Sequence, residues 1–394
     1  MRIRANKLCL IFSLICCYQT EAQNHFVTKA ERERFVTDKV RFIDSVFSQT
    51  PDRKNEAKYQ SAFWASELML RKSIVAEEKL KYTLINFNRF SDNFKQSVLQ
   101  HIFTLYPTEF VNEIDSLIEL ERYEKRFVVM SNYLIRQNQG SERTYFEKLR
   151  KRFPDWKNNP ILNGFAIEHS EQPTLTNKQL NDLTTFRKTK REATIFVFVQ
   201  KNRDLPGIAM ILDNKGNFLR EENDTLKIRL LARSITYLPE YITNGNTPQG
   251  VFSVQSFGLS DNVFIGPSQT VNTVLPWEVS PKDFSFGKIE SSDWTLEIYN
   301  RFFPESWKNY LPKNMAYYAG KAGRSEIIIH GTTIDSGFYI GKDYYPFTPS
   351  LGCLCTLEKW SERDGSLLES EQMKLVNALK NNNIINALMY VIER

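Results

Sequence analysis

The stretch EIIIHGTTIDSGFYIGKDYYPFTPSLGCLCTL, residues 326–357, decides how the rest of this chain is interpreted. It opens with a short apolar run, Ile327–Ile329, that ends on His330 and Gly331. An apolar run bounded by turn-forming residues is typical of a buried strand. The pattern therefore predicts a strand that carries His330 at its end.

Later in the same stretch, Ser350 begins the sequence Ser-Leu-Gly-Cys-Leu-Cys. Gly352 allows the backbone to bend sharply just before Cys353, so that a thiol at this position can face a cleft. An imidazole beside a thiol draws it towards thiolate, the form that attacks carbonyl carbons. The pair Cys353 and His330 therefore indicates nucleophilic acyl transfer.

Other interpretations of the two residue types remain open. A histidine at a strand end can be hydrogen-bonded scaffolding, and a free cysteine is often a small buried hydrophobic residue. Cys353 and Cys355 are also the only cysteines after residue 22, so a disulfide or a metal pair is conceivable. Residues two apart close a strained ring, however, and metal sites normally need four ligands. We expect neither a metal nor another cofactor.

A third motif lies upstream, Thr247-Pro-Gln-Gly-Val-Phe-Ser-Val254, a turn that leads into an alternating strand. The order T-P-x-G-x-F-x-V, then H-G-T, then S-x-G-C resembles the L,D-transpeptidase (YkuD-like) catalytic domain of bacterial cell-wall enzymes. The resemblance covers residues 193–357. It implies a mostly-β domain that acts on peptidoglycan stem peptides through a thioester.

The resemblance implies a role for each site residue. Cys353 is the nucleophile and His330 the general base, and N–H groups from Gly352 to Leu354 bind the oxyanion. A backbone carbonyl, or the hydroxyl of Thr332 or Ser350, orients the imidazole. Gly331, Thr332, Leu354 and Tyr317 are expected near the substrate, Tyr317 because an aromatic residue faces the acyl-donor peptide in that family. Carbapenems acylate family members, so an adduct on Cys353 is expected.

The chain departs from the family at Cys355. The family commonly has arginine or asparagine two residues after the nucleophile, where it supports the nucleophile loop. Three functions therefore stay open: an L,D-transpeptidase, an L,D-carboxypeptidase or other hydrolase of the same wall peptides, and a catalytically weak wall-binding scaffold. For Cys355 itself we expect a packing role, with a redox latch to Cys353 as the alternative.

The first 22 residues have the pattern of a secretory signal peptide. Arg2, Arg4 and Lys7 precede an apolar run, residues 8–17, that is too short to span a bilayer. Thr20 and Ala22 then occupy the small-residue positions of a cleavage site. We expect a periplasmic protein, with lipoprotein anchoring as the second interpretation and no transmembrane span.

Composition excludes some classes of protein. Of 394 residues, 41% are hydrophobic and 13% aromatic, which is ample for a buried core. The formal net charge is only +6, and no basic face with interleaved aromatic residues is evident. Nucleic-acid binding is therefore not expected.

Two domains follow the leader. Residues 23–175 form a predicted all-α domain, with four to six helices between residues 28 and 152 in a HEAT- or TPR-like stack, because apolar residues recur at three- and four-residue spacing. Such stacks usually dock partners, so a protein partner is expected here.

Residues 176–394 form the predicted catalytic domain, in which one helix near residues 177–188 precedes β-branched, aromatic strands such as residues 193–200. A long insertion, residues 260–310, carries three tryptophans and could wall the cleft. The predicted fold class is thus a multidomain α+β protein, with a helical-repeat-like domain followed by a mostly-β domain.

Overall fold

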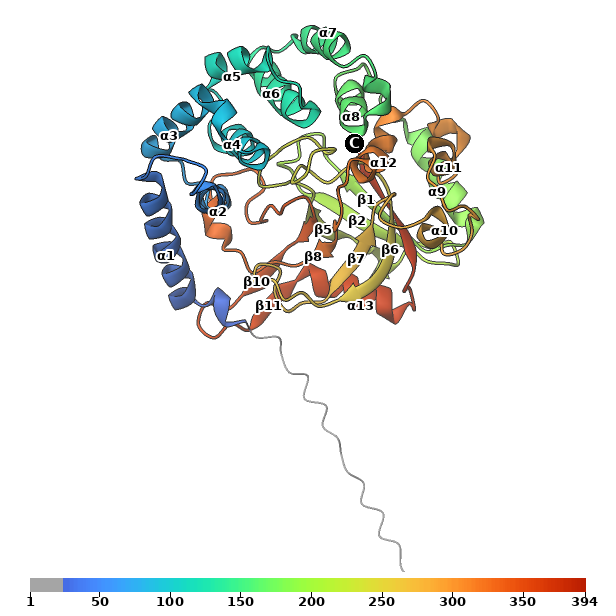
Figure 1. Cartoon of the computed structure of the whole chain (residues 1–394). Helices are drawn as coiled ribbons and strands as arrows, with labels where there is room; N and C mark the ends of the chain where they lie inside the picture. The colour runs from blue at the N-terminus through green and yellow to red at the C-terminus, as the bar shows by residue number, and fades with distance from the viewer. Residues whose placement is uncertain (1–23) are drawn as a thin grey trace, which may run out of the picture.

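A computed structural model describes residues 24–394 of the chain. The predicted signal peptide lies outside the described residues. An N-terminal helical region is followed by a sheet-rich region, as Figure 1 shows. The sheet-rich region is built on an eight-stranded barrel. Within the described residues, no helix is both long and apolar enough to cross a membrane.

Between residues 24 and 169 the described chain contains eight α-helices. Seven of them lie between residues 29 and 152, one more than the upper end of the sequence prediction. They are α1 (Lys29–Phe47), α2 (Glu56–Leu68), α3 (Ile74–Ile85), α4 (Asp92–Leu105), α5 (Val111–Ile118), α6 (Glu124–Gln137), α7 (Glu142–Arg152) and α8 (Pro160–Glu168). Helix α4 begins directly after Ser91, whose hydroxyl accepts the N–H of Phe94 at 3.2 Å.

The helices form two rows. Helices α2, α4, α6 and α8 contact one another in succession, and α1 and α3, then α3 and α5, do the same. Figure 1 shows the even-numbered helices on the inner side of an arc that curves around the barrel. This is the helical stack that the three- and four-residue periodicity predicts.

The barrel is closed, with the strand order β1-β12-β6-β7-β8-β9-β5-β2. Its strands are β1 (Thr194–Val199), β2 (Gly207–Leu212), β5 (Ile228–Leu231), β6 (Gly250–Gly258), β7 (Thr270–Val274), β8 (Ile329–His330), β9 (Leu354–Thr356) and β12 (Ala387–Glu393). Two pairs, β1 with β12 and β8 with β9, are parallel.

The remaining elements cover the barrel or join its strands. They are the helices α9 (Asn177–Lys190), α10 (Pro281–Phe284), α11 (Leu296–Asn300), α12 (Met315–Lys321) and α13 (Glu371–Asn381), and the short strands β3 (Arg220–Glu221), β4 (Asp224–Thr225), β10 (Glu358–Trp360) and β11 (Leu367–Ser370). Six short 3-10 helices complete the described chain: His25–Val27, Phe87–Arg89, Trp156–Asn158, Glu305–Trp307, Leu311–Asn314 and Ser336–Tyr339.

One difference from the sequence prediction concerns the barrel itself. Residues 260–310 are not wholly an insertion, because they contain β7, which pairs with β6 and β8. In the rest of this excursion, two of the three tryptophans pack inward. Trp294 and Trp307 are 7% and 1% exposed and belong to one aromatic core, whereas Trp277 is 41% exposed. Neither of these two buried tryptophans lines the cleft described below, but Asn262, Phe264 and Ile265 of the same excursion do, so this segment contributes both to the core and to a wall of the cleft.

The helical stack and the barrel region share a hydrophobic core. Leu238, Tyr241 and Ile242, from the loop between β5 and β6, are buried in the same cluster as the inner helices, together with Met315 of α12. Helix α12 also contacts α8 directly. The stack is therefore packed onto the barrel region through a loop and a helix that belong to the latter.

Candidate active site

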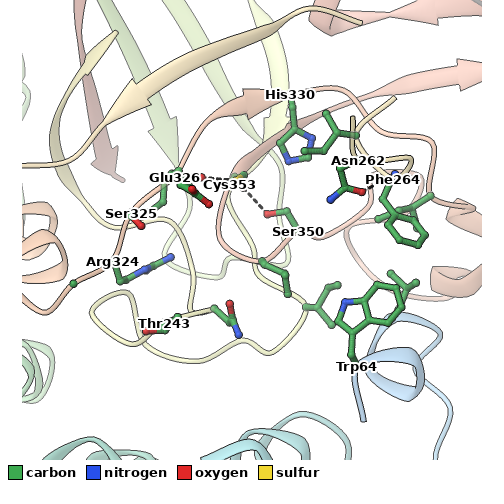
Figure 2. Close-up of a pocket in the computed structure, with 18 residues that line it drawn as sticks. Trp64, Thr243, Asn262, Phe264, Arg324, Ser325, Glu326, His330, Ser350 and Cys353 are labelled. Atoms are coloured by element: carbon green, nitrogen blue, oxygen red, sulfur yellow. Dashed lines mark hydrogen bonds between the residues drawn. The ribbon is translucent and has the colours of Figure 1, made fainter. Parts of the chain in front are cut away.

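Two neighbouring strands bring His330 and Cys353 together. His330 ends β8, and Cys353 immediately precedes β9, which pairs with β8 in parallel register so that Ile329 lies opposite Leu354. Both side chains line one cavity of about 410 Å³. Figure 2 shows the imidazole and the thiol facing this cavity, with Ser350 beside them.

The wall opposite the nucleophile comes from the helical stack. Trp64 and Leu68 of α2 line the cavity, and the Trp64 ring packs against Phe264 with their centroids 5.3 Å apart. Figure 2 shows Trp64 projecting from its helix towards Phe264 and Asn262. The helical region thus contributes directly to the cleft, a role that helical periodicity alone does not predict.

His330 is held in one orientation and one tautomer. Its side chain is buried, and Nδ1 lies within hydrogen-bond distance of the Gly331 carbonyl oxygen. Because a carbonyl only accepts, Nδ1 carries the proton, and Nε2 is left with a lone pair. Burial lowers the pKa of His330, with the Gly331 hydrogen bond opposing the shift. The imidazole is therefore neutral near pH 7, as a general base must be.

The Cys353 thiol is half-buried and donates to the carbonyl oxygen of Glu326 at 3.5 Å. Burial raises its pKa above the ordinary value, while a backbone hydrogen bond from Ile328 and the positive charge of Arg324 act to lower it, and the charge of Glu326 acts to raise it. The resting pair is thus a neutral thiol and a neutral imidazole. No hydrogen bond joins them among the described residues, and such contacts commonly tighten only when substrate binds.

The nucleophile loop is fixed by hydroxyl groups. The Ser350 hydroxyl donates to the Cys353 carbonyl at 2.8 Å and accepts the N–H of Gly352 at 3.0 Å. Thr247, the first residue of the upstream motif, donates its hydroxyl proton to the Gly352 carbonyl at 2.9 Å. The two motifs that stand a hundred residues apart in the sequence are therefore joined at the nucleophile.

Gly352 is required at this bend. Its φ is +117°, a conformation that side chains rarely adopt. A Cβ at this position would also collide with Nη2 of Arg324 and lie 2.6 Å from the carbonyl oxygen of Gly245. The backbone of the nucleophile loop therefore lies directly against a guanidinium group.

That guanidinium, Arg324, is a site residue that sequence reasoning missed. It is 4% exposed, and it donates to the carbonyl oxygens of Gly245 at 3.0 Å and Asn246 at 2.8 Å, and to that of Glu240. Burial lowers the pKa of Arg324 to about 10, and the Cys353 and Glu240 charges act to raise it. Arg324 is therefore a cation at neutral pH. It bonds to the loop between β5 and β6 and packs against the nucleophile loop at Gly352. A guanidinium group thus lies beside the nucleophile loop although residue 355 is a cysteine.

The predicted oxyanion donors are only partly available. The N–H of Gly352 is bonded to Ser350, and the N–H of Leu354 is bonded to the Ile328 carbonyl at 3.0 Å. Of the three backbone N–H groups from 352 to 354, only that of Cys353 carries no hydrogen bond within residues 24–394. An oxyanion would therefore be stabilised by the Cys353 N–H and by the nearby positive charge of Arg324.

Four predicted substrate-side residues do not line the cavity. Leu354 is wholly buried in the barrel core, and Tyr317 packs among Tyr299, Trp277 and Tyr318. Gly331 and Thr332 lie against the Glu358 carboxylate, which accepts the Thr332 N–H at 3.0 Å and leaves no space for a side chain at 331. Leu354, Gly331 and Thr332 thus lie beside or directly after the strand that carries His330, and Tyr317 belongs to a separate aromatic cluster. Cys353, His330 and Ser350 line the cavity.

Cys355 is buried, at 1% exposure, with its sulfur 3.6 Å from the Thr348 hydroxyl. Burial raises the pKa of its thiol to about 12. Both cysteines are free, and only Cys353 lines the cavity. This geometry favours the packing interpretation of Cys355 over the redox latch.

We therefore expect Cys355→Ala to leave activity within about twofold of wild type and to lower the free energy of unfolding by about 1 kcal/mol, as a small core deletion does. Denaturant titration and turnover assays, with and without reductant, measure both quantities. Activation of the wild type by reductant, with no effect on the variant, would instead establish a latch.

No family model, curated protein or solved structure matches this chain. The geometry of Cys353, His330, Ser350 and Arg324 is therefore the basis for assigning a function.

Proposed function

We propose that this protein is an exported cysteine acyltransferase of the L,D-transpeptidase type that acts on peptidoglycan stem peptides. The observation that carries the proposal is the position of Cys353 and His330 on adjacent barrel strands, facing one cavity, with the imidazole tautomer that leaves Nε2 able to accept a proton. The choice of peptidoglycan stem peptides as substrate rests on the resemblance of the three ordered motifs to the L,D-transpeptidase catalytic domain.

In the first half-reaction, Sγ of Cys353 attacks the carbonyl carbon of the scissile amide while its proton passes to Nε2 of His330. The tetrahedral intermediate then loses the C–N bond, and His330 returns the proton to the departing amine. The product is a thioester on Cys353. The Gly331 carbonyl bonded to Nδ1 stabilises the imidazolium that forms between these steps.

In the second half-reaction, an amine attacks the thioester and His330 removes its proton, which the departing Cys353 thiolate receives. This gives a cross-link, whereas attack by water gives a shortened peptide. The Arg324 charge favours an active enzyme over a scaffold, because it lies beside the nucleophile loop and acts to lower the pKa of the Cys353 thiol.

Incubation with a disaccharide-tetrapeptide, followed by mass spectrometry, tests the proposal. Dimers are expected for a transferase, and disaccharide-tripeptide alone would identify a hydrolase acting through the same site. Unchanged substrate, together with no mass increment on Cys353 after prolonged exposure to a carbapenem, would overturn the acyltransferase assignment. Denatured protein serves as the control in both assays.

A further inference from the structure

Glu326 lies beside the nucleophile, and hydrogen bonds to its neighbours hold its backbone in an unusual conformation. Its φ is +58°, in the left-handed region that residues other than glycine seldom occupy. Its N–H is accepted by a Glu278 carboxylate oxygen at 3.0 Å, and its carbonyl accepts the Cys353 thiol at 3.5 Å. The backbone of Glu326 is thereby fixed on both sides, and strained residues of this kind cluster at functional sites.

This backbone conformation sends the side chain into the cleft. Glu326 is exposed and lines the 410 Å³ cavity, and Figure 2 shows its carboxylate directed into the cavity next to Cys353. The described residues offer it no hydrogen-bond or ion-pair partner. Arg324, the nearest cation in the lining, is occupied by three backbone carbonyls.

The two charged groups beside the Cys353 thiol therefore have opposite effects on its pKa. The buried Arg324 guanidinium favours the thiolate, and the Glu326 carboxylate disfavours it by raising the pKa of Cys353. Glu278, behind Glu326, is an acid as well, and His330 is a neutral imidazole, so neither cancels the carboxylate. A free carboxylate at this place weakens the nucleophile unless a ligand cation neutralises it.

We propose that Glu326 is a cation-binding subsite of the cleft, which takes a primary ammonium group carried by the acyl donor close to its scissile amide. This inference rests on the proposed function. Binding of the ammonium pairs the carboxylate and removes the negative charge that opposes thiolate formation. The donor thus contributes to the activation of the cysteine that attacks it, and donors without the ammonium are discriminated against at the acylation step.

The first test uses two donors, a disaccharide-tetrapeptide with a free primary amine on its third residue and the same compound after N-acetylation of that amine. Intact-mass spectrometry follows formation of the thioester in a single turnover, which does not depend on the acyl acceptor. In the wild type, acetylation is expected to slow thioester formation by about 10- to 100-fold, the range for loss of a charge-assisted contact. In Glu326→Gln, the free amine donor loses the charge-assisted contact and should be slowed, but by less than acetylation slows the wild type, because the charge that opposes the thiolate is also gone. Acetylation should have little further effect on the variant.

The second test needs no substrate. Iodoacetamide is uncharged and reacts with the Cys353 thiolate, while Cys355 is buried and does not compete. Glu326→Gln should be alkylated about two- to fivefold faster than wild type at pH 7–8, because the opposing charge is gone. Acylation by the natural donor therefore slows while alkylation quickens. A variant that merely disturbed the loop would not produce opposite changes.

Glu297→Gln is the matched control, because Glu297 is 87% exposed on α11 and is not part of the cleft lining. It should match the wild type in both tests. Equal acylation of both donors by the wild type, or unchanged alkylation in Glu326→Gln, would overturn the subsite and leave the proposed function intact. Absence of any thioester from either donor would overturn the proposed function itself.

Discussion

Replacing Cys353 by alanine is expected to lower product formation from wall peptides by at least about 1000-fold, because no other group in the cavity can form the thioester. His330→Ala should lose nearly as much, since the thiol has a raised pKa and depends on Nε2 to accept its proton. Turnover of disaccharide-tetrapeptide, quantified by mass spectrometry, measures both losses.

The two losses should not add. The double variant Cys353→Ala/His330→Ala is expected to be no slower than Cys353→Ala alone, because the two side chains act in a single step. The half-buried position of Cys353 implies that the melting temperature changes little. Turnover like that of the wild type in Cys353→Ala would show that another residue is the nucleophile.

Arg324→Met is the second substitution with a large expected effect. Methionine keeps the length of the side chain but leaves the carbonyls of Glu240, Gly245 and Asn246 without their donor. The expected loss of stability is about 3–5 kcal/mol, typical for removal of a buried, hydrogen-bonded cation. Displacement of the Gly352 backbone should also slow acylation by about 100-fold.

The electrostatic part of this prediction can be measured separately. Loss of the positive charge raises the pKa of Cys353 further, so alkylation of Arg324→Met by iodoacetamide at pH 7–8 should be slower than that of the wild type, the opposite of the change expected for Glu326→Gln. Arg324→Lys retains the positive charge but not the planar set of donors. Compared with Arg324→Met, it should restore the alkylation rate more fully than the free energy of unfolding. Stability and alkylation both equal to wild type would contradict the role assigned to Arg324.

The parts of this site that local patterns encode could be predicted from the sequence. The apolar run before His330, the glycine before Cys353 and the Thr247 motif each have a local signature, and the structure joins them. Arg324 has none, because its role depends on carbonyls of a loop some eighty residues earlier in the chain. The only available signal was an absence, namely the lack of a supporting arginine or asparagine at residue 355.

The fold shows the same limit. The β-branched run at β1 specifies its strand locally. Strand β7, Thr-Val-Asn-Thr-Val, is short and lies among tryptophans and prolines, and it becomes a strand because β6 and β8 offer it backbone partners. The contribution of Trp64 and Leu68 of α2 to the cleft lining likewise depends on how the helical stack packs against the barrel, which local sequence patterns do not encode.

The core that the helices share with the loop between β5 and β6 has a thermodynamic consequence. Leu238, Tyr241 and Ile242 pack with the helices, while Glu240, Gly245 and Asn246 of the same loop hold Arg324. Unfolding of the helical stack would expose the apolar side chains of the loop between β5 and β6, and this loop holds Arg324 beside the nucleophile loop. We therefore expect the helical stack and the barrel to unfold together, in one cooperative transition. The change of sequence pattern near residue 175 does not separate two independently stable units.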